Sequence, residues 1–274
     1  MPKISICTPC WVDKDAPENK RQPRYEMFLR AAQSIFSQTN HDFEWVIVDD
    51  MSNPSICKIM EDLNPPEWLN YKVIRLDQKG GRIIARNRAM KEATGEWLCW
   101  FDSDDELSSI YVDGMIHAIN TYPEFKVFNF NHLTIGYTYD TNVRRFINME
   151  VQGDNPFGSG NIGSGAFVFH RDLYEKVGSL PEKGLWDFAS EFLERHPECK
   201  PFFESKEQPG KYHSLGNPFG DDYFYFYELT RLSTSKYLEW APYFVHNRYG
   251  HKWPNEKEYD DKQGSVPSYN PNNI

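Results

Sequence analysis

The chain has 274 residues, of which 39% are hydrophobic and 16% aromatic, so it can bury a substantial core and is too apolar to be disordered as a whole. Its formal charge of -10 argues against general nucleic-acid binding, because phosphate backbones call for a basic surface. No apolar run approaches the roughly 18 residues that span a bilayer, and the N-terminus enters a strand pattern at once. We therefore expect a cytoplasmic protein, free or peripheral to a membrane, with no transmembrane segment.

Strand and helix patterns alternate in the first part of the chain. Strands are expected over 3–8, 43–48, 71–76 and 97–101. A first helix is expected to begin near Tyr25, and a second to begin at Asn53 and Pro54 and to end at Leu63. Two more helices are expected over 83–93 and 110–122. Such alternation implies βαβ units and an α/β fold with a mostly parallel central sheet flanked by helices.

The regular alternation fades after this point, which predicts a smaller mixed region. Expected elements are a strand over 127–132, a hairpin over 137–148, strands over 166–170 and 240–245, and a helix over 171–177. The glycine-rich stretch 158–165 is read either as a loop near the substrate or as a plain flexible connection. Residues from 252 onward are expected to form an ill-ordered tail.

A cluster of carboxylates follows the apolar run 97–101. Asp102, Asp104 and Asp105 lie within four residues, and such crowding is unfavourable unless solvent or a cation offsets the repulsion. Oxygen ligands of this kind suit a hard ion such as Mg2+ or Mn2+. The plain alternative is an acidic turn that ends the strand.

The cluster does not match two other carboxylate motifs in full. A calcium loop of the EF-hand type requires glycine at its sixth position, where this chain has Leu107. A phosphatase of the haloacid dehalogenase type calls for threonine or valine where Glu106 stands, which leaves that class a weak alternative.

Polar residues end several of the expected strands. Thr8, Asp50 and the pair Asp102 and Asp104 all lie at predicted carboxyl ends. Ligands of parallel sheets bind beyond these ends, so separate stretches of the chain are expected to converge on one crevice.

These motifs, in this order, resemble those of family 2 glycosyltransferases, which are nucleotide-sugar enzymes of the GT-A fold. The matching stretches are 4–9 (ISICTP), 46–52 (VIVDDMS), 85–89 (ARNRA) and 100–105 (WFDSDD). The resemblance covers roughly 3–120 closely and, more loosely, 166–178 and 220–248.

The resemblance implies a nucleoside site at the first strand ends. Thr8, Pro9 and Asp50 would hold the nucleoside, with the Asp50 carboxylate accepting the N3 proton of uracil. The alternative for Asp50 is a turn or helix-cap residue. Arg82 and Arg86 would reach the diphosphate, although one of them is expected to be only a solvated helix residue.

The resemblance also implies a metal site at the acidic cluster. Asp104 would be the direct metal ligand, Asp102 would lie nearer the ribose or the water shell of the metal, and Ser103 would belong to the nucleotide-sugar site. Asp105 is expected either to join them or only to cap the following helix. His246 would be a late metal ligand or would touch the diphosphate, although a histidine on an apolar strand is as often structural.

A general base is implied by the late motif Gly220-Asp-Asp-Tyr-Phe, in which Asp222 would take the proton of an acceptor hydroxyl. The plain alternative is that Asp221 and Asp222 complement a helix N-terminus, which is compatible with catalysis. An insertion over about 179–219 departs from the family pattern and is expected to shape acceptor specificity.

The resemblance therefore predicts one GT-A domain over 1–251 and a tail over 252–274. A nucleotide-binding half over 1–107 would be followed by an acceptor-binding half over 108–251. The predicted activity is metal-assisted, inverting transfer of a sugar from a UDP-sugar to a glycan or other hydroxyl acceptor, with Mn2+ or Mg2+. The alternatives are a sugar-nucleotide pyrophosphorylase and a catalytically silent nucleotide-sugar-binding protein.

Overall fold

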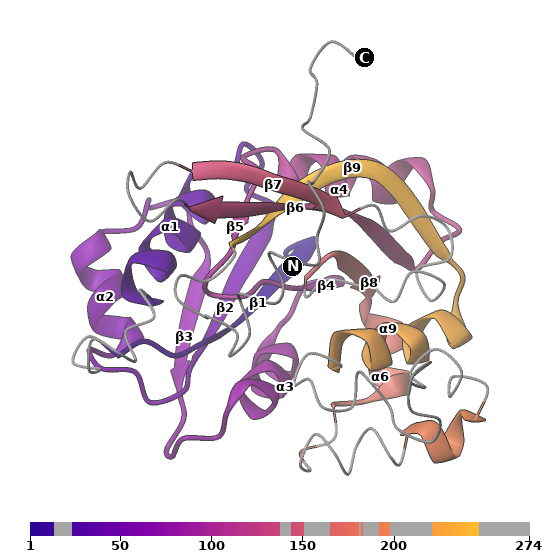
Figure 1. The fold of residues 1–274 in the computed structure, drawn as a ribbon, viewed down its shortest axis with the longest axis horizontal. Helices are drawn as coiled ribbons and strands as arrows, with labels where there is room; N and C mark the ends of the chain where they lie inside the picture. Colours follow the sequence, from indigo (N-terminus) through magenta and orange to yellow (C-terminus); the bar gives the residue numbers. More distant parts are fainter. Residues whose placement is uncertain are drawn as a thin grey trace, which may run out of the picture.

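The structure is a computed structural model that describes residues 1–13, 24–137, 144–150, 165–180, 182, 192–197 and 221–246. For 133–137, 144–150, 221–223, 241 and 245–246 it describes the backbone alone. Within these residues a nine-stranded sheet runs in the order β3-β2-β1-β4-β8-β6-β9-β5, with β7 paired to β6 (Figure 1).

The first half of the chain supplies the parallel part of the sheet and four helices. Its elements are β1 (Ile4–Cys10), α1 (Arg24–Phe36), β2 (Phe43–Asp49), α2 (Ile56–Leu63), β3 (Tyr71–Arg75), α3 (Arg82–Glu92), β4 (Trp97–Trp100), β5 (Glu106–Leu107) and α4 (Tyr111–Thr121). The second half contributes β6 (Val127–Tyr137), β7 (Arg144–Glu150), β8 (Phe167–His170), α6 (Arg171–Val177), α9 (Asp221–Leu232) and β9 (Ser235–His246). Among the described helices none is long and apolar enough to cross a membrane.

The sheet is parallel where the nucleotide-binding half was predicted and mixed beyond it. β1 pairs in parallel with β2 and β4, and β2 pairs in parallel with β3. β8 then joins β4 and β6 in antiparallel fashion, while β9 runs parallel to β6 and antiparallel to β5. The predicted α/β fold with a mostly parallel sheet and a smaller mixed region is confirmed.

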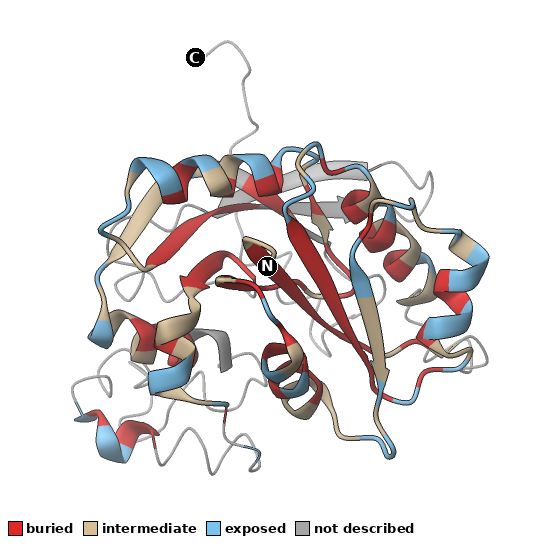
Figure 2. Ribbon diagram, turned by 180° about the vertical axis from the view of Figure 1, so that it is seen from behind, coloured by how far each residue is buried: buried red, intermediate tan, exposed pale blue. Residues whose placement is uncertain are grey.

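Both faces of the parallel strands are covered, because successive side chains point to opposite sides of a strand. On one face Ile6, Trp45 and Cys99 pack with α1, α2 and α4. On the other, Val46 and Trp100 pack with α3, α6 and α9. Figure 2 shows the central strands buried along their length and the helices buried only on their inner sides.

The structure corrects several predicted boundaries. β1 continues through Pro9 to Cys10, where a loop was predicted from Pro9 onward. β6 extends to Tyr137 and pairs antiparallel with β7, so the hairpin predicted over 137–148 begins too late. β9 starts at Ser235, five residues before its predicted start, and β5 was not predicted at all. The tail over 252–274 and the glycine-rich stretch before Gly165 lie outside the described residues.

A buried carboxylate joins three strands at the edge of the sheet remote from the predicted crevice. Glu44 on β2 accepts hydrogen bonds from the Ser5 hydroxyl at 2.6 Å, from the Thr94 hydroxyl at 2.8 Å and from the Thr94 backbone amide. Lys72 lies 3.5 Å from its other oxygen. Burial by itself raises the pKa of Glu44, but the hydrogen bonds and Lys72 outweigh it, so the pKa lies below its ordinary value.

Glu44 should therefore make stability depend on pH in acid. Because the folded state lowers the pKa of Glu44, its contribution is complete above the ordinary glutamate pKa of about 4.3 and is lost as the pH falls through the lower folded value. Glu44→Gln should lower the free energy of unfolding at neutral pH by roughly 1–3 kcal/mol and flatten its acid dependence. Urea unfolding between about pH 3 and 7 measures both, with the exposed Glu67→Gln as control. Parallel acid profiles for Glu44→Gln and the wild type would contradict this role.

Candidate active site

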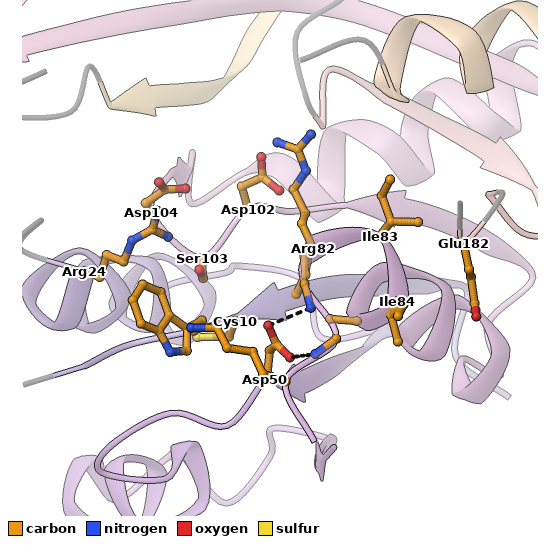
Figure 3. A pocket seen from close by; sticks show the side chains of 16 residues that line it. Cys10, Arg24, Asp50, Arg82, Ile83, Ile84, Asp102, Ser103, Asp104 and Glu182 are labelled. Carbon is orange, nitrogen blue, oxygen red and sulfur yellow. Dashed lines mark hydrogen bonds between the residues drawn. The ribbon is translucent and has the colours of Figure 1, made fainter. Parts of the chain in front are cut away.

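A pocket of about 550 Å³ lies beyond the carboxyl ends of β1, β2 and β4, at the start of α3 (Figure 3). Its lining comes from separate stretches of the chain: Pro9, Cys10, Trp11, Arg24, Asp50, Lys79, Gly80, Gly81, Arg82, Ile83, Ile84, Ala85, Asp102, Ser103, Asp104 and Glu182. The predicted convergence of strand ends on one crevice is thus found in the fold.

The acidic cluster lies at the end of β4, and two of its members, Asp102 and Asp104, line this pocket. Asp102, Asp104 and Asp105 each offer a carboxylate oxygen, and these oxygens lie within 4.8 Å of one another. Asp104 and Asp105 are 6% and 5% exposed, and the Asp105 amide closes a turn onto the Asp102 carbonyl at 3.2 Å. Three carboxylates at this spacing repel one another. Their oxygens fit a hard divalent cation, which would balance their negative charge.

Arg86, on α3, contacts the acidic cluster but is not among the residues that line the pocket. Its guanidinium donates to Asp102 Oδ1 at 2.7 Å and lies 4.2 Å from the centre of the Trp100 ring. The side chain is fully buried, so Arg86 is not a solvated helix residue. The predicted contact of Arg86 with a diphosphate stays a prediction, and in the structure Arg86 is linked to the pocket through Asp102.

Asp105 is held by a tyrosine from the last described strand. The Tyr243 hydroxyl on β9 donates to Asp105 Oδ2 at 2.9 Å and accepts the Asp102 backbone amide at 3.1 Å. Burial, followed by the charges of Asp105 and Asp102, raises the pKa of Tyr243 well above its ordinary value. The expectation that Asp105 only caps a helix is wrong, because α4 begins six residues later at Tyr111.

Asp50 joins the end of β2 to the glycine turn that precedes α3. Its two carboxylate oxygens accept the backbone amides of Gly80 at 2.6 Å and Gly81 at 3.0 Å, as the dashed lines of Figure 3 show. Gly81 has φ of 82°, a left-handed conformation that favours glycine. Arg82 is the first residue of α3, one residue before the predicted start of that helix, and lines the pocket.

Of the two site residues predicted at the end of the first strand, Pro9 lines the pocket and Thr8 does not. Thr8 is fully buried and accepts the Trp45 indole N–H at 2.9 Å, and it does not line the pocket. Because β1 continues to Cys10, the residues that reach the crevice are Pro9, Cys10 and Trp11. The nucleoside contact of Thr8 stays a prediction, and Cys10 and Trp11 are further candidates beside the predicted Pro9.

Trp11 and Lys79 were missed by sequence reasoning. The Lys79 ammonium lies 3.6 Å from the centre of the Trp11 ring, so the two side chains form one wall of the pocket. The sequence signal for Trp11 is its position directly after the carboxyl end of β1, where an aromatic side chain can reach the pocket. It was overlooked because the strand was ended two residues too early.

The two late candidates are placed by their backbones alone. Asp221 and Asp222 are the first residues of α9, a position that both readings of the pair predict. His246 ends β9, where its backbone pairs with Ile135 of β6. The greater part of the predicted insertion, 179–219, lies outside the described residues.

The chain is thus an α/β domain with an acidic cluster at the carboxyl end of a parallel strand. The sequence profile of Glycosyl transferase family 2 matches residues 20–178, over half of the chain, and the chain belongs to this family.

Named relatives agree with this family. The teichoic acid poly(glycerol phosphate) polymerase of Staphylococcus epidermidis is 30% identical over 107 residues, 35% of this chain and 15% of the polymerase. Poly(ribitol-phosphate) beta-N-acetylglucosaminyltransferase TarS of Staphylococcus aureus is 33% identical over 109 residues, 39% of this chain and 17% of TarS.

Solved structures share the fold. A crystal structure of TarS residues 1–349 with UDP-GlcNAc superposes with a TM-score of 0.58 at 19% identity, over 90% of this chain and 59% of that one. The mannosyltransferase PcManGT of Pyrobaculum calidifontis, in complex with GDP-Man and Mn2+, gives a TM-score of 0.53 at 14% identity, over 92% and 58%. The chain thus spans less than two thirds of the length of these relatives.

Proposed function

We propose that this chain is an inverting glycosyltransferase that moves a sugar from a UDP-sugar to a hydroxyl acceptor with the help of Mn2+ or Mg2+. The observation that carries the proposal is one pocket lined both by Asp102 and Asp104 of the acidic cluster and by the strand-end residues Asp50 and Trp11. TarS, with the same fold, is solved with UDP-GlcNAc, which supports a uridine donor here.

The nucleoside end of the donor would lie between β1 and the glycine turn. Trp11 offers an aromatic face for a base, and Lys79 and Arg24 bring positive charge to that ring. The Asp50 carboxylate, already fixed by two backbone amides, keeps further lone pairs that can accept the N3 proton of uracil. Cytosine has no such proton, so this contact would favour UDP over CDP.

The diphosphate would lie between the start of α3 and the acidic cluster. Arg82 offers a guanidinium for phosphate oxygens, and the α3 N-terminus adds the favourable end of a helix dipole. Asp104, Asp102 and Asp105 would hold the divalent cation, which supplies charge neutralisation for the departing diphosphate. Arg86 and Tyr243 keep two of these carboxylates in place.

The acceptor would approach from the side of α9. Asp222 would take the proton of the acceptor hydroxyl as that oxygen attacks the anomeric carbon, which inverts the configuration. His246 would be a further ligand or diphosphate contact at the end of β9. The residues of the acceptor site are expected in the second half of the chain, the insertion included.

The two rival functions make different demands on the chain. A pyrophosphorylase would need a glycine-rich nucleotide loop with a basic residue after the first strand. In this chain β1 is followed by Trp11, Val12 and Asp13 instead. A silent binding protein would need the donor pocket and no base, so only turnover separates it from the enzyme.

A thermal-shift panel of nucleotides tests the proposal. UDP or one UDP-sugar should raise the unfolding midpoint, more with Mn2+ than with EDTA, because a ligand that binds only the folded state stabilises it. At a hundred times its dissociation constant the gain is about 2.7 kcal/mol, whereas CDP and GDP should give less. No response to any uridine nucleotide would overturn the donor assignment. A UDP response without any UDP release from a UDP-sugar would favour the silent protein.

A further inference from the structure

The hydroxyl of Tyr243 bridges the two ends of the acidic turn. It accepts a hydrogen bond from the backbone amide of Asp102 at 3.1 Å and donates its own hydrogen bond to Asp105 Oδ2 at 2.9 Å. Tyr243 is fully buried and follows Asp102 by 141 positions in the chain. A strand from the far end of the described chain thus supplies the link between two carboxylate-bearing residues.

The ring of Tyr243 is held in place from several sides. Phe101 meets it edge to face with ring centres 6.0 Å apart. Gly165, at φ of 81°, lies so close that a Cβ there would come within 2.6 Å of the Tyr243 hydroxyl and 2.7 Å of the Trp100 carbonyl. Gly165, the last glycine of the glycine-rich stretch, therefore leaves the space that the Tyr243 side chain occupies.

The backbone of β9 is fastened to the same loop. Leu107, two residues after Asp105, pairs directly with Tyr243 in the β5–β9 ladder. The Ser108 amide donates to the Pro242 carbonyl at 2.7 Å. The hydroxyl is therefore fixed relative to the acidic turn by the backbone as well as by packing.

We propose that Tyr243 is a positioning residue for the cation site, orienting the Asp105 carboxylate and the Asp102 backbone so that the three aspartates converge. The inference rests on the proposed function, and it adds that the last strand controls the affinity of that site for its cation. Three carboxylates within 4.8 Å repel one another, and a neutral hydroxyl can orient one without cancelling its charge. Removal of such an outer hydrogen bond typically weakens metal binding 10–100-fold.

Mn2+ titration of Tyr243→Phe at a fixed concentration of UDP tests the inference. The Mn2+ dissociation constant should rise about 10–100-fold, while UDP binding in EDTA should change less than about twofold. Tyr237→Phe is the matched control, because Tyr237 on the same strand donates its hydroxyl to Asn131 at 2.9 Å, apart from the acidic turn. An equal loss of Mn2+ affinity in both variants would show that β9 acts only on the fold and would overturn the proposal.

A double-mutant cycle shows whether Tyr243 acts through Asp105. In an Asp105→Asn background, Tyr243→Phe should raise the Mn2+ dissociation constant by a smaller factor than it does in the wild type, because coupled residues are not additive. Full additivity would overturn the proposal. If Tyr243→Phe does not fold, Asp105→Asn alone decides: wild-type Mn2+ affinity in that variant would leave the Asp105 carboxylate without a part in cation binding.

The wild-type protein separates the two levels of inference. Wild type without Mn2+-dependent UDP binding would overturn the proposed function and this inference together. Mn2+-dependent UDP binding that is the same in wild type and Tyr243→Phe would overturn this inference alone.

Discussion

Replacement of Asp104 with alanine is expected to lower sugar transfer by roughly a thousandfold or more and to remove the Mn2+-dependent part of UDP binding. Asp104 lines the pocket and lies 6% exposed within the acidic cluster, where it would be a direct ligand of the cation. A bound cation stabilises the charge of a leaving phosphate by several kcal/mol, which corresponds to such a loss of rate. UDP release from a UDP-sugar and the UDP thermal shift with and without Mn2+ measure the two effects.

Asp104 is a better probe than Asp102. Asp102 also neutralises the buried guanidinium of Arg86, so its removal would leave a buried charge, which typically costs about 3–5 kcal/mol of folding stability. Asp62→Ala on α2 is the matched control, because Asp62 is 59% exposed and pairs only at the surface with Lys58. Retention of the Mn2+-dependent UDP shift in Asp104→Ala would refute its role as a ligand.

The parallel half of the fold was predictable because burial there follows a simple pattern. β4 is a continuous apolar run and β2 is apolar from Trp45 to Val48, as expected of strands covered on both faces. The first strand is predicted to end before Pro9, because proline has no backbone N–H to donate to a neighbouring strand. In the structure β1 pairs with β4 only as far as Cys7, so Pro9 lies where β1 has a single neighbour, β2.

The mixed half was less predictable because its partners are distant in sequence. β5 has two residues, too few to show any period, and exists because β9 pairs with it. β9 is itself interrupted by an irregularity opposite Phe130 and His132 and contains Pro242. Local patterns do not record such pairings.

The site, too, has residues that the local sequence predicts and residues that it does not. Asp50, Asp102 and Asp104 were predictable, since polar residues at the ends of apolar strands mark the crevice of a parallel sheet. The partners that hold them were not: Arg86 looks like a surface residue on a helix, and Tyr243 lies on a strand recognised only in part. Both are buried by tertiary contacts that no spacing in the sequence reveals.

Replacement of Asp222 with asparagine is expected to lower sugar transfer about 10²–10⁴-fold while donor binding stays within about twofold of wild type. Asp222 is the second residue of α9, and loss of a general base removes proton transfer from the acceptor hydroxyl without changing the contacts of the nucleotide. The UDP thermal shift with Mn2+ reports donor binding, and UDP release from the donor selected by the nucleotide panel reports turnover.

Asp221→Asn is the matched comparison for Asp222→Asn, because both substitutions remove one negative charge from the α9 N-terminus. If the aspartates served only the helix dipole, each variant would lose about 0.3–1 kcal/mol of stability and neither would lose turnover selectively. A general base at Asp222 instead predicts a large loss of turnover in one variant and at most a few-fold change in the other. Full turnover in Asp222→Asn would exclude it as the base, and a loss confined to Asp221→Asn would assign the base to Asp221.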